Sequence, residues 1–264
     1  MATGPRVLAR TATIAGSLVG AFSLVALPAA PAPAATNSFY VDRTVAGCSD
    51  SGPGTSGTPY CTVAKGVSAL SAGATLYVGN GTYAETVTPT VSGTASSPVT
   101  ITAWPGRHPV VGAGVGSGVT LSSKSYVTIS DLVVAGTIGA GISVSGGSNV
   151  TLSGNEVRNA GSPARGRIAV GINLHGTTDS LVTGNYTHDN SNTGIYLSSG
   201  ATRDTVSENV STHNANGYQR NANGIDVISP GNTLLANRTY NTEDSGIQFY
   251  PGGNDNLAML NVSY

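Results

Sequence analysis

Charged residues are scarce in this chain of 264 residues. Only 9% of the residues are charged, and the formal net charge is -1 at pH 7. Proteins that bind nucleic acid need a basic surface for the phosphate groups, so this composition gives no support for a nucleic-acid partner. Lysine is the rarest charged residue, since Lys65 and Lys124 are the only two.

Long apolar runs are also lacking, with one exception near the start of the chain. Residues 13–27 are mostly apolar, Arg6 and Arg10 precede them, and the small-residue segment PAAPAPAAT follows. This order is typical of a secretory signal peptide over residues 1–35, cleaved near Ala34 or Ala35. A membrane anchor is the alternative, but glycines and serines interrupt the short run. We therefore expect a secreted, extracellular monomer without membrane contact after cleavage.

Cysteine is almost absent, and Cys48 and Cys61 are the only two. Both lie in the segment GCSDSGPGTSGTPYC, where they flank a loop rich in glycine, proline and serine. In an exported chain such a close pair predicts a disulfide, which contributes about 3 kcal/mol through the entropy of the unfolded chain. A redox or metal-binding pair is the less favoured alternative.

Glycine, by contrast, is abundant, and six of the 36 glycines open the same short motif. The motif is a glycine, a β-branched residue, a variable residue and an apolar residue, and it begins at Gly118, Gly141, Gly171, Gly194, Gly224 and Gly246. A second segment, such as NVTLSGNEV or DSLVTGNYT, follows most of these motifs. Short strands that repeat about every 23 to 30 residues, with no helix between them, indicate stacked coils. The sequence therefore predicts an all-β fold, a parallel β-helix.

The two ends of the predicted solenoid differ. The segment TVAKGVSAL has apolar residues at a helical spacing, at Val63, Val67 and Leu70, and predicts a short helix that caps the first coil. No similar cap is visible at the other end, because the sequence stops at AMLNVSY within a repeat. We expect one β-helix domain over residues 36–264 that is incomplete at its C-terminal end.

The segment FYVDRTVAGCSDSGPGTSGTPYCTVAKGVSALSAGATLYVGNGTYAETV is followed by the glycine–isoleucine coils. Together they resemble exported bacterial right-handed parallel β-helix proteins of the pectate-lyase-like superfamily. The resemblance covers nearly all of the mature chain and implies a right-handed coil. That superfamily includes polyuronate lyases, glycoside hydrolases, carbon-5 epimerases, phage tailspikes and adhesins, so the resemblance does not fix the reaction.

Strand alternation separates the core of these coils from their surface. If each motif glycine faces outward, the second residue faces inward, the third outward and the fourth inward. Aliphatic side chains then fill the inward positions. The outward positions form a polar and aromatic stripe: Asn173, His175, Tyr196, Asp226, Gln248 and Tyr250. Such side chains suit a sugar chain, whereas the alternative is an ordinary solvated sheet face.

Asparagine recurs at one place in successive coils, at Asn155, Asn185, Asn209, Asn237 and Asn261. We interpret this column as a ladder of amide hydrogen bonds, so the NYT, NVS and NRT triplets are not read as glycosylation sites. Four residues further on, Asn159, Asp189, His213 and Asn241 form a looser column that we assign to turns.

Two repeat intervals are longer than the others because of the insertions RNAGSPARGRIAV and HNANGYQRNAN. These insertions add Arg158, Arg165, Arg167, Tyr218 and Arg220. We expect the two loops to wall a groove beside the stripe, although arginine in loops is ordinarily solvated. Guanidinium groups bind carboxylates through paired hydrogen bonds, so Arg167 and Tyr218 are predicted to bind an acidic polysaccharide.

A polyuronate lyase needs a base for the proton beside the sugar carboxylate, and often Ca²⁺ to neutralise that carboxylate. Neither lysine lies on the stripe, so the predicted catalytic residues are Arg220, His175 and Asp226. The predicted Ca²⁺ ligands are Asp226, Glu243 and Asp244. Asp226 and Asp244 lie four strand positions out of register, about 13 Å along the strand, which weakens this site.

Two other functions stay open from the sequence. A non-catalytic carbohydrate-binding or surface protein needs the stripe but no base. A glycoside hydrolase needs two carboxyl groups about 5–9.5 Å apart, for which Asp226 and Asp244 are the available pair. The leading prediction is an extracellular protein that binds and cleaves a pectate-like or alginate-like polysaccharide by β-elimination.

Overall fold

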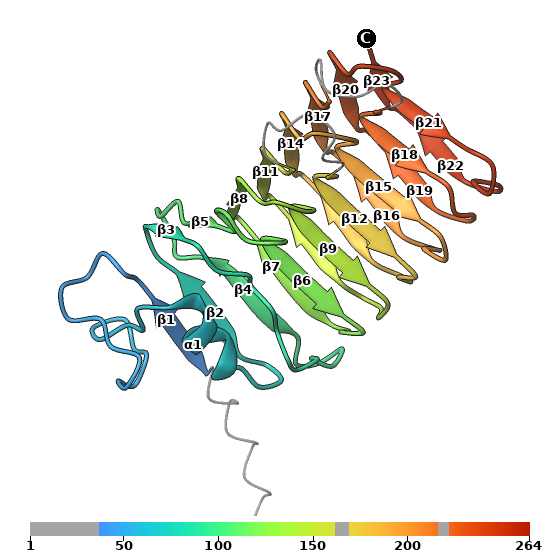
Figure 1. Ribbon diagram of the computed structural model, residues 1–264. Helices are drawn as coiled ribbons and strands as arrows, with labels where there is room; N and C mark the ends of the chain where they lie inside the picture. Colours follow the sequence, from blue (N-terminus) through green and yellow to red (C-terminus); the bar gives the residue numbers. More distant parts are fainter. Residues whose placement is uncertain (1–36, 162–168, 216–221) are drawn as a thin grey trace, which may run out of the picture. The chain divides into compact units, whose positions relative to one another are not determined.

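The computed structural model describes residues 37–161, 169–215 and 222–264. Within these ranges the strands form three sheets, which we call A, B and C (Figure 1). From β4 onward, each coil contributes one strand to sheet A, one to sheet B and one to sheet C in chain order. Strands of neighbouring coils pair in parallel, for example β9 with β12 and β12 with β15. The predicted parallel β-helix is confirmed.

Sheet A consists of β1 (Ser38–Val41), β2 (Thr75–Val78), β4 (Val99–Ala103), β7 (Val127–Ser130), β10 (Thr151–Ser153), β13 (Leu181–Thr183), β16 (Thr205–Ser207), β19 (Thr233–Leu235) and β22 (Leu257–Met259). Sheet B consists of β3 (Thr82–Tyr83), β5 (Val110–Val111), β8 (Val133–Ala135), β11 (Glu156–Arg158), β14 (Tyr186–His188), β17 (Val210–Thr212), β20 (Arg238–Tyr240) and β23 (Val262–Ser263). Sheet C consists of β6 (Val119–Ser122), β9 (Ile142–Ser145), β12 (Ile172–His175), β15 (Ile195–Ser198), β18 (Ile225–Val227) and β21 (Ile247–Phe249).

Inward side chains of the three sheets fill the interior of the coils. The isoleucines of sheet C pair in register and are fully buried, at Ile142, Ile172, Ile195 and Ile225. Their predicted inward orientation is confirmed. In the coil that contains β21, Ile247 is half-buried and Phe249 is 42% exposed. Each fully buried aliphatic side chain contributes about 1.5–3 kcal/mol, so these columns hold neighbouring coils together.

The motif glycines do not face outward, and that expectation was wrong. Each glycine directly precedes a strand of sheet C, where the chain arrives from sheet B. A Cβ atom at Gly141 would collide with the side chain of Val157, and one at Gly194 would collide with the side chain of Ser211. Both of these residues belong to sheet B. Glycine is needed because the corner brings its backbone against buried side chains.

The asparagine column is a hydrogen-bonded ladder at the turn from sheet A to sheet B. Each side-chain amide donates from Nδ2 to Oδ1 of the next asparagine, over 3.0, 3.0, 2.9 and 2.9 Å. The four earlier members are at most 1% exposed. The structural interpretation of this column is confirmed, because amides this deeply buried are satisfied by one another. The members are Asn155, Asn185, Asn209, Asn237 and Asn261.

The looser column four residues further on adopts left-handed backbone conformations. The φ values are 54° at Asn159 and Asp189, and 50° at His213 and Asn241. Asparagine and aspartate tolerate this region better than most residues, which explains their recurrence there. The assignment of the column to turns is confirmed. The adjacent buried pair of Asn190 and Asn214, with an amide hydrogen bond of 2.9 Å, was not expected from the sequence.

The N-terminal part of the described chain contains the predicted helix and disulfide. Helix α1 (Val63–Ser68) packs against β1 and β2. Gly66 allows this close approach, because a Cβ there would lie 2.5 Å from Val41 Cγ2 and 2.7 Å from Leu76 Cδ1. Cys48 and Cys61 form a disulfide with a Cα–Cα distance of 5.0 Å.

The predicted signal peptide, residues 1–35, lies outside the described residues. Among the residues that are described, no helix has the length and apolar character needed to cross a membrane.

Candidate functional site

The outer face of sheet C aligns most of the predicted stripe. Asn173 pairs with Tyr196, Tyr196 pairs with Asp226, and Asp226 pairs with Gln248 across four neighbouring strands. Neighbouring strands lie about 4.8 Å apart, so these four side chains form one continuous column. The flanking residues of β12, β15 and β18 point into the core, which fixes the outward direction of the column.

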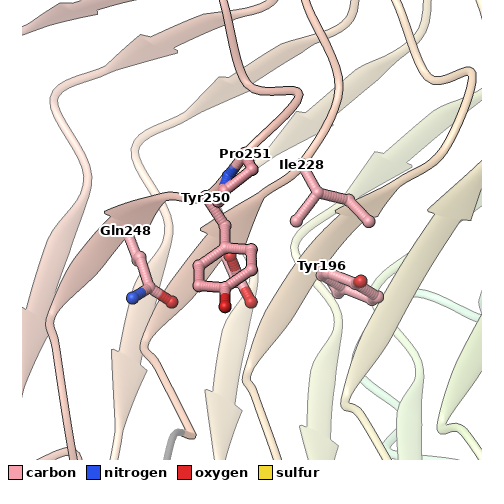
Figure 2. Close-up of a pocket in the computed structure, with 6 residues that line it drawn as sticks. Tyr196, Ile228, Gln248, Tyr250 and Pro251 are labelled. Carbon is pink, nitrogen blue, oxygen red and sulfur yellow. The ribbon is translucent and has the colours of Figure 1, made fainter.

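A groove of about 550 Å³ lies over the end of this column. It is lined by Tyr196, Asp226, Ile228, Gln248, Tyr250 and Pro251. Figure 2 shows the ring of Tyr250 between Gln248 and Tyr196, with Ile228 above Tyr196 in this view. Tyr250 is 58% exposed, so a face of its ring is available to a ligand.

Two residues of the groove were not predicted as site residues. Ile228 directly follows β18, and Pro251 directly follows Tyr250. An apolar side chain at the next outward position of the alternation was the available signal for Ile228. The signal for Pro251 was weaker, because no strand alternation extends to it.

Asp226 contributes a carboxyl group to the lining of the groove. Its Oδ1 atom is buried and has no hydrogen-bond partner among the described residues. Burial raises the pKa of this carboxyl above its ordinary value of 3.8. Burial, together with the nearby charge of Asp226, also raises the pKa of the Tyr196 phenol. This part of the groove therefore favours a protonated carboxyl group or a ligand that donates to it.

Gln248 is oriented by a buried neighbour. The Asn223 side chain is fully buried and donates from Nδ2 to Gln248 Oε1 over 2.7 Å. The carbonyl oxygen of Gln248 is thus engaged by the protein, and its amide NH₂ group remains as a donor toward the groove.

His175 lies on the same sheet face but outside the groove lining. It sits on β12, two coils from Asp226, so about 10 Å of sheet separates their backbones. Its Nδ1 atom lies 3.2 Å from Ser198 Oγ, and Ser198 Oγ lies 3.2 Å from Asn173 Oδ1. The structure brings His175 together with Asn173, not with Asp226.

The predicted Ca²⁺ ligands do not assemble into one donor set. Asp226 pairs with Gln248, so Asp244 precedes that partner by four residues, as the sequence indicated. Glu243 and Asp244 are exposed. Among the described residues, no group of three His, Cys, Asp or Glu side chains is placed to hold a metal ion. Calcium prefers six to eight oxygen ligands, a number that these residues do not gather.

Several predicted site residues cannot be placed. Arg165 and Arg167 fall in residues 162–168, and Tyr218 and Arg220 fall in residues 216–221, all outside the described ranges. Arg158 is described, and it lies on β11 of sheet B, where its Nε atom is 2.8 Å from Glu156 Oε1. Its expected position in a loop beside the stripe was therefore wrong.

Comparison with known proteins relates this architecture to right-handed β-helix proteins. The family described as Pel9A-like, right handed beta helix region matches residues 40–263. The structure of XylC with xylose gives a TM-score of 0.62 at 12% identity, covering 86% of this chain and 64% of that chain. Pectate lyase Pel9A gives 0.59 at 16% identity, covering 79% and 64%. A mannuronic acid specific polysaccharide family 6 lyase from human gut microbiota gives 0.59 at 16% identity, covering 75% and 50%.

At these identities the likeness concerns the fold. The family description agrees with the predicted right-handed coil. The chain spans 64% or less of the length of these three solved structures. A search of curated proteins found no match.

Proposed function

The chain belongs to the family of Pel9A-like right-handed β-helix regions, and on that premise we propose that it binds a uronate-containing polysaccharide along sheet C and cleaves it by β-elimination. The observation that carries this proposal is the groove, which two tyrosines line together with Asp226 and Gln248. Two solved structures of similar fold are lyases, one for pectate and one specific for mannuronic acid, which supports the substrate class.

Sugar binding follows from the shape and chemistry of the groove lining. The C–H faces of a pyranose ring stack on aromatic rings, and Tyr196 and Tyr250 offer such rings. Ile228 and Pro251 extend the apolar part of the surface beside them. The amide of Gln248 and the carboxyl of Asp226 then bond to hydroxyl or carboxyl groups at the ring edge.

β-Elimination places a specific demand on this groove. A base takes the proton at C5 of the uronate, and the electron pair of that bond forms a C4–C5 double bond. The bond from C4 to the glycosidic oxygen breaks, and that oxygen keeps the bonding electrons and takes a proton from water. Negative charge builds up on the uronate carboxylate, and preorganised hydrogen-bond donors lower the barrier to its formation. The Gln248 amide is such a donor, and Asp226 is a second one in its protonated form, which burial of the carboxyl stabilises.

Two residues remain as candidates for the base, and neither is among the six described side chains that line the groove. His175 is oriented by Ser198 and lies on the sheet C face, two coils from Asp226. Arg220 precedes β18 in the sequence and lies outside the described residues. The predicted calcium ligands do not form one donor set among the described residues, and calcium dependence stays a prediction.

Carbohydrate binding without catalysis is the second candidate function. It is favoured by the groove lining, since none of the six described side chains around the groove is basic. A hydrolase has less support, because Asp226 is the one carboxyl group among those six and two are needed.

Incubation of the secreted protein with polygalacturonate, alginate and neutral xylan tests this function. Ultraviolet absorbance reports the unsaturated product, affinity electrophoresis reports binding, and EDTA in parallel samples tests calcium. We expect polyuronate binding with product formation, and about fivefold or more loss of affinity in Tyr196→Ala and in Tyr250→Ala through lost stacking. Thr205→Ala on sheet A is the matched control.

His175→Ala and Arg220→Ala identify the base, since its loss reduces turnover far more than binding. Binding without product would leave the non-catalytic function, and unchanged affinity in both tyrosine variants would overturn the proposal.

A further inference from the structure

The outer face of sheet B has an unusual composition. Its strands β14, β17, β20 and β23 lie next to one another in successive coils (Figure 1). Their outward side chains, with the residue after β23, include Tyr186, His188, Arg238, Tyr240 and Tyr264. The outward positions of β10, β13, β16 and β19 on sheet A hold only threonine, serine and leucine. Contact with solvent alone therefore does not explain the aromatic and basic side chains of sheet B.

Arg238 is the centre of the first cluster on this face. Its Cζ atom lies 5.3 Å from the ring centroid of Tyr240 and 5.4 Å from that of Tyr264. The two rings stack with centroids 5.3 Å apart and planes 6° apart. Arg238 Nε donates to Tyr264 Oη over 3.0 Å. No carboxylate lies within ion-pair distance of Arg238 in the described part of the chain. An exposed guanidinium group is thus held in place by phenol rings and keeps its charge uncompensated.

Tyr186 and His188 form the second cluster. Their rings stack with centroids 4.3 Å apart, and Tyr186 is 40% exposed. His188 lies 3.3 Å from Glu156 Oε1 and 2.5 Å from Asp189 Oδ2, and Arg158 Nε also contacts Glu156 Oε1 at 2.8 Å. Tyr186 pairs with Val210 and Val210 pairs with Arg238, which places the clusters two coils apart, about 10 Å.

We propose that this face of sheet B is a second binding site for an acidic polysaccharide, in which Arg238 binds a sugar carboxylate while Tyr264 and Tyr186 stack on sugar rings. Arginine suits this role because its planar fork makes two parallel hydrogen bonds to a carboxylate. The polysaccharide would run along the axis of the β-helix and cross successive coils, because the exposed rings of Tyr186 and Tyr264 lie in different coils. The site goes beyond the proposed function, because it shares no residue with the groove of sheet C.

The test measures migration in low-salt native gels that contain polygalacturonate or neutral dextran. Arg238→Ala is compared with Arg203→Ala, which removes an equal charge from a guanidinium group that is paired with Asp179 at 2.7 Å. We expect Arg238→Ala and Tyr186→Ala each to weaken polygalacturonate binding about tenfold. Arg203→Ala should leave polygalacturonate binding unchanged, and none of the variants should change the migration in dextran. Arg238→Lys keeps the charge without the fork, so an intermediate loss is expected. Circular dichroism confirms that the variants fold.

The same variants are also made in a protein that carries Tyr196→Ala and Tyr250→Ala. Residual polygalacturonate binding in that background, removed by Arg238→Ala, supports the second site whether or not the sheet C groove binds sugar. Equal behaviour of Arg238→Ala and Arg203→Ala in both backgrounds would overturn it. Failure of the wild-type protein to bind polygalacturonate would overturn it as well.

Discussion

Asp226 is the side chain on which the chemistry of the groove depends most. A carboxylate with a buried, unpartnered oxygen is costly, and the protein reduces that cost by protonation or by a bound donor. On a fully solvated sheet face, an aspartate side chain can rotate so that both carboxyl oxygens contact water. Its burial beside Tyr196 and Gln248 is therefore better explained by a ligand-binding role than by solubility.

Asp226→Asn tests this carboxyl through the pH dependence of stability. Its pKa is raised in the folded protein, so between the ordinary value of 3.8 and the raised value the folded state binds more protons than the unfolded state. The contribution of the Asp226 carboxyl to the free energy of unfolding of the wild type is therefore lost as pH rises through that window. Because asparagine does not ionise, the variant should gain stability relative to wild type as pH rises from about 4 to 7.

Urea midpoints at a series of pH values measure this difference. Asp255→Asn is the matched control, since Asp255 is exposed in a turn with φ of 54°, which asparagine also tolerates. A difference between Asp226→Asn and wild type that stays constant with pH would contradict the assigned environment.

The strands and turns show which parts of the site a sequence can reveal. Period-two alternation placed Tyr196, Asp226 and Gln248 on one outward column, because side chains in a strand alternate strictly. It failed at the motif glycines, because they lie in a corner between two sheets, where alternation does not apply. It also missed the sheet B surface, because Arg238 resembles any solvated surface charge until the stacking of the coils is known. The residues of the two insertions have no repeat to follow, so neither alternation nor register predicts their positions.

Gly194→Ala tests the corner glycines. An added Cβ would lie 2.6 Å from Thr187 Oγ1 and 2.7 Å from Asn214 Nδ2, and all of these neighbours are buried. We expect a loss of about 1–3 kcal/mol in the free energy of unfolding, as overpacking of a dense interior costs. Gly57→Ala is the control, because a Cβ there meets no atom within 4 Å, and its effect should stay within about 0.5 kcal/mol. Equal stability of the two variants in urea would show that the corner tolerates a side chain.

The coil as a unit presents three faces that differ in chemistry although the backbone of each is the same. In the later coils sheet C carries amides, tyrosines and Asp226, sheet B carries tyrosines, histidine and Arg238, and sheet A carries threonine, serine and leucine. Stacked coils about 4.8 Å apart repeat each face at an interval suited to successive units of a linear polymer. This arrangement relates the repeat seen in the sequence to recognition of an extended polysaccharide.

Amide NMR spectra of isotope-labelled protein, titrated with polygalacturonate oligosaccharides, test the role of sheet C most directly. The largest shift changes should occur at the Gln248 side-chain amide and at the backbone amides of Tyr196 and Tyr250, with a second set around Arg238. The outward positions of sheet A provide the internal control and should not change. Binding of the oligosaccharide with unchanged sheet C amides would contradict the assignment of this groove as the polysaccharide site.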